Sequence, residues 1–183
     1  MRWSVAVCTL ALFLVGSAIA QDHPAEKRSD DRWYQAVMAT TAGHFSFQLP
    51  GRPPKPRSVQ RVSGAGTKYT VLIWSAVFDG GAYQVQMATL PRNVDVTNPR
   101  HNLQATLDGD ATLLKGGKFA STEWKEDQGL TAVDAVGRTI SGRDMRVYSA
   151  MKGLRVFTLT YLGAAGSASA ADVNRFIGSV RVH

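Results

Sequence analysis

The sequence predicts an α+β fold in which one antiparallel β-sheet is flanked by α-helices. Two observations carry this prediction: strand-like runs follow one another across short turns, and two amphipathic helical patterns interrupt them. The chain shows no internal repeat and no interdomain linker, so residues 33–183 are predicted to form a single domain.

The first twenty residues predict export. "MRWSVAVCTLALFLVGSAIA" has Arg2 near its start, then an apolar run, then small residues at Ala18 and Ala20. This is the pattern of a secretory signal peptide cleaved near Ala20, and its apolar run is shorter than the roughly 20 residues of a spanning helix. We therefore expect residues 1–20 to be removed, which leaves a periplasmic or secreted chain without a transmembrane segment.

The next segments lead into the domain. Residues 21–32, "QDHPAEKRSDDR", are polar with mixed charge, which predicts a flexible leader. Residues 33–38, "WYQAVM", fit either a strand or a helical turn, and the pattern leaves both open. Residues 44–50, "HFSFQLP", predict a strand that ends at Pro50, because proline has no amide proton to donate.

A hairpin is predicted in the middle of the chain. Residues 67–78 are apolar on both faces, as in a central strand, and "DGG" at 79–81 favours a tight turn. Residues 82–90 alternate, which places Gln84 and Gln86 on the outward face. The inward set of that strand is Tyr83, Val85 and Met87.

The best-marked helix begins after Asn98, which can cap the first turn, with Pro99 in the first helical position. Its apolar stripe is Leu103, Leu107, Ala111 and Leu114. Lys115 suits the negative C-terminal end of a helix, and Gly116 and Gly117 can adopt the left-handed ending.

The remaining elements complete the α+β pattern. Four further strands are expected at residues 118–125, 130–140, 143–151 and 154–162. The last helix is predicted from a capping box formed by Ser169 and Asp172. Its apolar stripe is Val173, Phe176, Ile177 and Val180.

Composition limits the chemistry of the exported chain. Cys8 is the only cysteine and lies in the predicted signal peptide, so the mature chain has no disulfide and no thiolate. The formal net charge of +7 becomes +6 when Arg2 is removed. This basic balance favours an anionic partner, and no recognition motif points to nucleic acid. Solubility alone is the commoner reason for such a charge.

No catalytic, cofactor or metal motif is visible. The four histidines lack a metal-ligand spacing, and there is no G-x-S-x-G motif. Residues 63–70, "SGAGTKYT", lack the order of a phosphate-binding loop and are interpreted as a mobile loop. Asp108 and Asp110 are two apart on a helix and so face different directions. We expect no enzyme, no cofactor and no metal.

One segment is a candidate binding surface: the basic, proline-rich run "GRPPKPR" at residues 51–57. Its prolines favour an extended backbone that a partner can bind at low entropic cost. Arg52, Lys55 and Arg57 are therefore the candidates for a partner surface. The alternative is a semi-rigid connection from an edge strand, charged so that it stays solvated, and the pattern favours this alternative.

Six motifs follow one another over residues 43–182: "GHFSFQLPGRP", "DGGAYQVQM", "LKGGKF", "SGRDMRVY", "GLRVFTLTYLG" and "DVNRFIGSVRV". Their order resembles that of bacterial exported proteins of the PsbP-like fold. The resemblance implies an α/β/α sandwich and a group that includes extrinsic photosystem proteins, a Ran-binding nuclear import factor and uncharacterised envelope proteins. No catalytic residue defines that group, so it implies none here.

The leading functional interpretation is a non-catalytic exported binding or assembly module that contacts an envelope protein or an anionic envelope component. Two alternatives stay open. One is a carrier of a small apolar ligand between sheet and helix, lined by Leu72, Trp74 and Phe78. The other is an exported enzyme with a site dispersed in the sequence.

Overall fold

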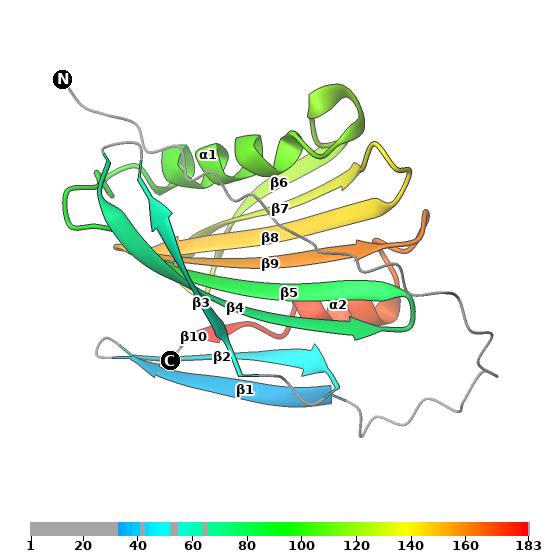
Figure 1. Ribbon diagram of the computed structural model, residues 1–183, viewed down its shortest axis with the longest axis horizontal. Coiled ribbons are helices and arrows are strands. Elements are labelled where there is room, and N and C mark those ends of the chain that lie inside the picture. The colour runs from blue at the N-terminus through cyan, green and yellow to red at the C-terminus, as the bar shows by residue number, and fades with distance from the viewer. Residues whose placement is uncertain (1–32, 41–42, 52–54, 64–65, 183) are drawn as a thin grey trace.

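The computed structural model describes residues 33–40, 43–51, 55–63 and 66–182. Within them the chain forms a seven-stranded sheet, a three-stranded sheet and two α-helices (Figure 1). The predicted signal peptide, the leader and Arg52 lie outside the described residues, so these interpretations stay predictions.

The large sheet is antiparallel throughout, in the order β3-β4-β5-β9-β8-β7-β6. Its strands are β3 (Arg57–Val62), β4 (Lys68–Phe78), β5 (Gly81–Thr89), β6 (Ser121–Asp127), β7 (Leu130–Arg138), β8 (Asp144–Lys152) and β9 (Arg155–Gly163). Sequence-adjacent strands form hairpins, and the β5–β9 pair joins the two halves of the sheet. The predicted succession of hairpins is therefore confirmed.

The small sheet has the order β1-β2-β10. Its strands are β1 (Trp33–Thr40), β2 (Gly43–Pro50) and β10 (Arg181–Val182). The segment at 33–38, which the sequence left open, is a strand, and the strand predicted at 44–50 is confirmed.

Helix α1 (Pro99–Ala111) starts as predicted, because the side chain of Asn98 accepts a hydrogen bond from the backbone N–H of His101 at 3.2 Å. It ends before the predicted stripe does. Leu114 lies beyond the helix in an isolated bridge with Thr139, yet it is still buried. A 3₁₀ turn, η2 (Lys115–Gly117), follows, and its two glycines have the left-handed φ values that the sequence predicted.

Helix α2 (Ala171–Ile177) corrects the predicted capping box. The residue before it is Ala170, and no side chain caps the first turn. The N–H of Ala170 donates instead to the carbonyl of Ser167 at 3.0 Å, so a backbone turn occupies the segment where the box would form. Val180 lies past the helix end but remains in the core, so the predicted stripe still faces inward.

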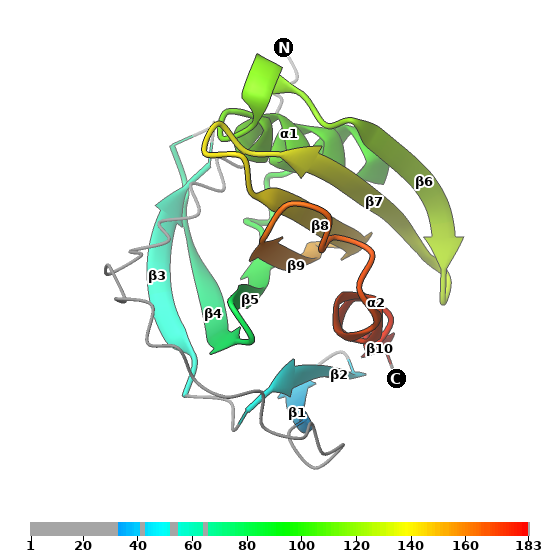
Figure 2. The ribbon, with the colours of Figure 1, turned by 90° about the vertical axis from the view of Figure 1, so that its right-hand side faces the viewer.

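Both faces of the large sheet are covered, by different layers. Helix α1 contacts β7 and β8 on one face, whereas α2 contacts β9 and β2 contacts β4 on the other. Figure 2 shows the sheet curving from β3 to β6, with α1 on one side and α2 and the small sheet on the other. The second layer therefore mixes a helix with three strands, unlike the two helical layers of the predicted α/β/α sandwich.

Gln84 and Gln86 were predicted to face outward, and the structure corrects this. They lie on the α1 side of β5, as the alternation requires, but both are buried. The Nε2 of Gln86 donates to Oε1 of Gln84 at 2.6 Å, and their cross-strand partners on β9 are Thr158 and Thr160. The pattern separates the two faces correctly, but the second face is buried too, so its glutamines form hydrogen bonds inside the protein.

Two features around residue 60 were missed. Strand β3 was not predicted, and residues 68–70 of the segment interpreted as a mobile loop belong to β4. The N–H of Ser63 donates to the carbonyl of Thr67 at 2.9 Å, and the N–H of Gly66 donates to the carbonyl of Ser63 at 2.8 Å. These bonds close the β3–β4 hairpin.

In the part of the chain that the structure describes, neither helix has the length and apolar character needed to cross a membrane.

Candidate functional site

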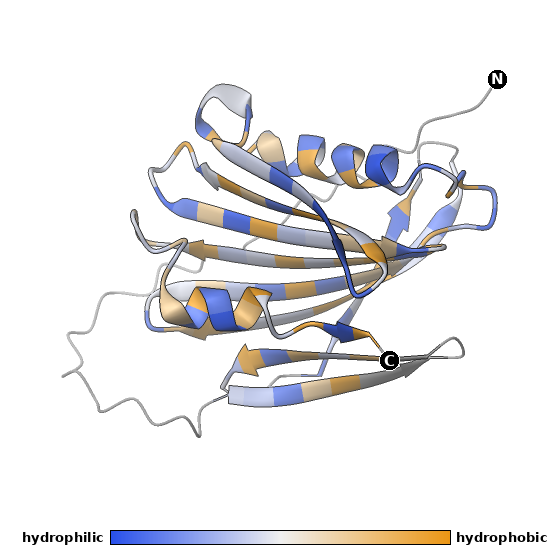
Figure 3. Cartoon of the chain, turned by 180° about the vertical axis from the view of Figure 1, so that it is seen from behind, coloured by the Kyte–Doolittle hydropathy of each residue, from blue (hydrophilic) through white to orange (hydrophobic). Residues whose placement is uncertain are grey.

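An open pocket of about 440 Å³ lies between the small sheet and the C-terminal end of α2. We call it the α2 pocket. Its lining residues are Gln35, Gln48, Asn174, Arg175, Gly178, Ser179 and Arg181. They come from β1, β2, α2, β10 and the connection from α2 to β10, and these elements lie next to one another in the view from behind (Figure 3). Its volume falls within the range of small-ligand sites.

Among the described residues, the lining combines two arginines with amide and hydroxyl groups. The guanidinium of Arg175 is held in a fixed orientation. Its Nε donates to Oε1 of Gln48 at 3.0 Å, and its Cζ lies 4.9 Å from the centroid of the Trp33 ring. A guanidinium fixed in this way loses little freedom when it binds a carboxylate or phosphate.

The second arginine, Arg181, is exposed and lies where the chain leaves α2. Its Nη1 donates to the carbonyls of Gly178 and Val180, at 2.7 and 2.6 Å. Ser179 joins the walls, because its Oγ accepts the N–H of Gln48 at 2.9 Å and donates to the carbonyl of Phe176 at 2.6 Å. Hydrogen bonds between α2, the residues after it and the small sheet therefore hold the walls of the pocket in place.

Two physical roles fit the arginines. Cations at the C-terminal end of a helix stabilise its exposed carbonyls, and Arg175 and Arg181 both lie there. Guanidinium groups also bind carboxylates and phosphates, and both arginines line the pocket. The first role is structural and the second is a binding role, and one pair of side chains can serve both.

A separate group of charges is paired within the fold on the α2 side of the sheet. Arg146 binds both carboxylate oxygens of Asp134, at 2.9 and 2.8 Å, and its Nη1 donates to Oδ1 of Asn174 at 2.6 Å. Lys125 lies 3.6 Å from the same carboxylate. The hydrogen bond to Asp134 raises the pKa of Arg146 above its ordinary value. These contacts hold α2 against β7 and β8.

Tyr148 belongs to the same region. Its hydroxyl donates to Oδ2 of Asp127 at 2.6 Å, and burial followed by this hydrogen bond raises the pKa of Tyr148. The tyrosine therefore stays protonated and serves as a hydrogen-bond donor between β8 and the end of β6.

Asp110 has a buried carboxyl group. The sequence predicted only that Asp108 and Asp110 face different directions on the helix. Asp108 is exposed, whereas Asp110 is on the buried side of α1. Burial raises the pKa of Asp110 to about 8. The side chain follows Asn102 and Thr106 along one edge of the helix, and both of these are buried. None of the three residues lines the α2 pocket.

Across the described ranges, no three His, Cys, Asp or Glu side chains are placed to hold a metal ion.

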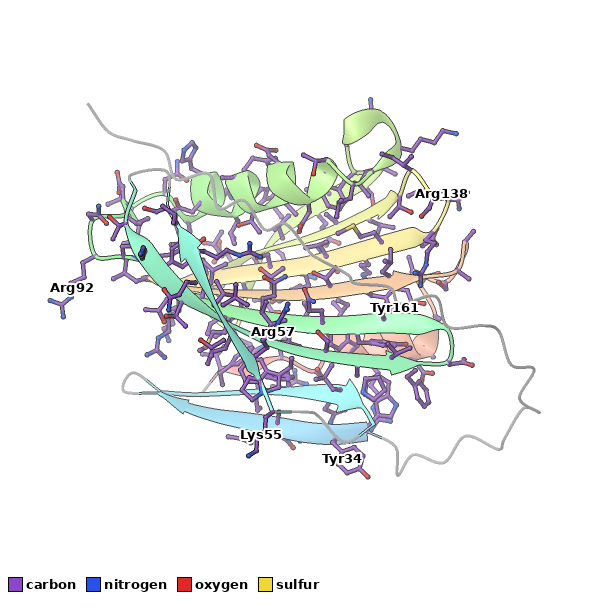
Figure 4. All side chains as sticks on the ribbon, in the orientation of Figure 1. Tyr34, Lys55, Arg57, Arg92, Arg138 and Tyr161 are labelled. Atoms are coloured by element: carbon purple, nitrogen blue, oxygen red, sulfur yellow. The ribbon has the colours of Figure 1, made fainter. Side chains whose placement is uncertain are left out.

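The structure describes two of the three basic candidates. Lys55 precedes β3 and Arg57 begins it, and both are exposed. In Figure 4, Lys55 lies near the lower rim of the molecule, whereas Arg57 lies higher, in front of the large sheet. Neither lines the α2 pocket.

The residues proposed to line an apolar carrier site lie in the core between the large sheet and the layer of α2 and the small sheet. Trp74 packs edge-on against Phe47 of β2, with the ring centroids 5.2 Å apart. Leu72 and Phe78 pack against the same core.

The α2 pocket itself was missed by sequence reasoning. Its walls bring Gln35 and Gln48 together with residues 174–181, and no local motif connects positions so distant in the chain. The nearest signal was the polar face of the last helix, where Asn174 and Arg175 interrupt the predicted apolar stripe.

No protein-family model matches the chain, and no curated protein matches it. Among solved structures, it is similar to cyanobacterial PsbP (CyanoP) from Synechocystis sp. PCC 6803. The match has 12% sequence identity and a TM-score of 0.50, and it covers 81% of this chain and 92% of that chain. The chain therefore has a PsbP-like fold, as the order of its motifs predicted.

Proposed function

We propose that this protein is a non-catalytic exported binding module, and that its α2 pocket holds an anionic group of an envelope partner. The observation that carries the proposal is the lining of the pocket, in which Arg175 and Arg181 accompany the amides of Gln35, Gln48 and Asn174 and the hydroxyl of Ser179. Arginine forks match the geometry of carboxylates and phosphates, and a basic chain favours such partners.

The absence of a catalytic role is part of the proposal. Two described groups have strongly shifted pKa values. Asp110 is buried on the inner side of α1, and Tyr148 is hydrogen-bonded to Asp127. Neither borders the pocket. A site that recognises an anion through fixed arginines and amides binds without needing a proton donor or acceptor.

The test is affinity capture from the organism's own envelope extract, with the chain from Gln21 to His183 as bait. The double variant Arg175→Gln/Arg181→Gln should retain roughly a tenth of the partner captured by the wild type. Arg92→Gln is the matched control, because Arg92 is exposed and lies at the far end of the molecule in Figure 4. This control should capture as well as the wild type.

Two comparisons make the result decisive. Thermal melts identify variants that lose binding only because they unfold. The single variant Arg181→Gln keeps Arg175 and its contacts, so it tests the pocket with a smaller change than the double variant. Vesicles that contain phosphatidylglycerol, compared with neutral vesicles, separate an anionic lipid from a protein partner. Undiminished capture by a folded double variant would contradict the pocket. Loss of capture in Lys55→Gln/Arg57→Gln alone would move the site to the basic run.

A further inference from the structure

The open edge of β1 is an eight-residue strand edge with no charge. Its sequence, "WYQAVMAT", contains no charged residue, no proline and no glycine. The strand pairs with β2 in continuous register from Trp33↔Pro50 to Thr40↔Gly43, so no bulge interrupts it. On its other side it has no partner strand among the described residues. Its outward N–H and C=O groups are therefore aligned as a template for another strand.

The other sheet edges of the described chain are protected. Strand β3 carries Arg57 and Arg61, and β10 has only two residues, one of them Arg181. The charged residues of β6 are Glu123, Lys125, Glu126 and Asp127. Charge and short length are the usual means by which proteins prevent edge-to-edge pairing. Among these edges, β1 alone lacks both.

Apolar side chains are exposed along this edge. Tyr34 is 43% exposed and Val37 is 64% exposed. They are three positions apart on a strand and so lie on opposite faces of the small sheet. Figure 3 shows β1 as the outermost strand, on the side of β2 away from the rest of the molecule. An added strand would contact side chains on both faces and cover both residues.

Charge and size decide which occupant fits. Gln35 of β1 forms part of the wall that contains Arg175 and Arg181. A second copy would bring the same positive charges together. It would also pair over one strand edge only about 26 Å long, whereas a stable dimer needs a buried area of roughly 1,000 Å². An acidic segment avoids the charge repulsion, and one strand edge is the whole contact that an added strand uses.

We propose that the open edge of β1 binds an extended, acidic segment of a partner protein as an added strand. Backbone hydrogen bonds to β1 would supply affinity, and alternate side chains of the segment would cover Tyr34 and Val37. Acidic residues of the segment would be attracted by Arg175 and Arg181, which share a wall with Gln35 of β1. The proposal stands on the strand edge and does not depend on the α2 pocket holding an anion.

The probe is a set of peptides selected from a random twelve-residue phage-display library on the chain from Gln21 to His183. Selected peptides should alternate apolar and polar residues and carry acidic residues. Val37→Glu should weaken their binding at least about tenfold, because it adds a repelling charge to the edge. Val77→Glu is the matched control, since Val77 is an exposed strand valine on β4, and it should leave affinity unchanged.

Hydrogen–deuterium exchange locates the bound peptide. We expect the peptide to slow hydrogen exchange across residues 33–40 and to leave exchange at residues 68–78 unchanged. Three outcomes would overturn the proposal. They are failure to select any peptide sensitive to Val37→Glu, protection confined to residues 174–181, and concentration-dependent dimers that protect β1 without peptide. The last would identify a second copy as the occupant.

Discussion

Asp110 is the residue at which burial and charge conflict most strongly. Its side chain is 1% exposed, and its Oδ2 is buried without a hydrogen-bond partner among the described residues. Burial raises its pKa from 3.8 to about 8, so the carboxyl group of the folded chain is protonated at neutral pH. In the unfolded chain the same group is ionised.

This difference predicts how stability changes with pH. The folded chain binds the proton more tightly, so the contribution of Asp110 to the free energy of unfolding is greatest below about pH 4 and falls as pH rises to about 8. Asp110→Asn keeps the shape and removes the titration. The variant should gain stability over the wild type progressively from pH 4 to pH 8, as measured by urea denaturation at each pH.

The exposed neighbour supplies the control for this prediction. Asp108→Asn alters an exposed carboxylate on the same helix and should not show a gain that grows with pH. A constant difference between Asp110→Asn and the wild type across the range would show that Asp110 is already ionised in the folded chain.

At the scale of the element, α2 depends on one ring. Phe176 is fully buried and meets Tyr83 edge-on, with the centroids 5.3 Å apart. Phe176→Ala should lower the free energy of unfolding by roughly 3–5 kcal/mol, because it leaves a cavity between α2 and the sheet. Urea melts measure the loss, with Val77→Ala as the exposed control, expected within about 0.5 kcal/mol of the wild type. A loss below about 1 kcal/mol for Phe176→Ala would mean that the helix does not depend on this ring.

Elements with a strong local signal were predictable from the sequence. The β4–β5 turn has Asp79 and Gly80 at φ values of 48° and 71°, as "DGG" required, and the cap on α1 forms as Asn98–Pro99 predicted. Strand β3 was not predictable, because it follows prolines and exposes most of its residues. The start of α2 was misplaced because Ser169 matched a capping pattern whose space a backbone turn occupies.

At the scale of the whole molecule, export is the central prediction. The mature protein should begin at or near Gln21 and be recovered outside the cytoplasm, because residues 1–20 have the organisation of a cleaved signal peptide. N-terminal sequencing and mass spectrometry of the protein from separate cell fractions measure this. Intact Met1–Ala20 on a cytosolic protein would contradict it.

The candidate site belongs to this same scale, which is why the sequence did not reveal it. The pattern of neighbouring residues predicts a strand or a helix. Gln48 and Arg175, by contrast, are in contact only because β2 and α2 pack side by side. The basic run at 51–57 is visible in the sequence because its charges are close together there, but Lys55 and Arg57 lie outside the pocket. Local patterns predicted the elements, and tertiary packing created the pocket.

The pairing of β2 with β10 has a consequence for the order of folding. It joins Phe45 to Val182 and Ser46 to Arg181, so the small sheet needs segments from both ends of the domain. The β1–β2 hairpin is local and can form early, whereas contacts this distant in sequence form late, because a long loop must be closed first. A chain that folds as it emerges from its N-terminal end therefore completes the α2 pocket last. If the pocket binds an anion as proposed, capture of that anion has to wait until Arg181 is in place beside β2.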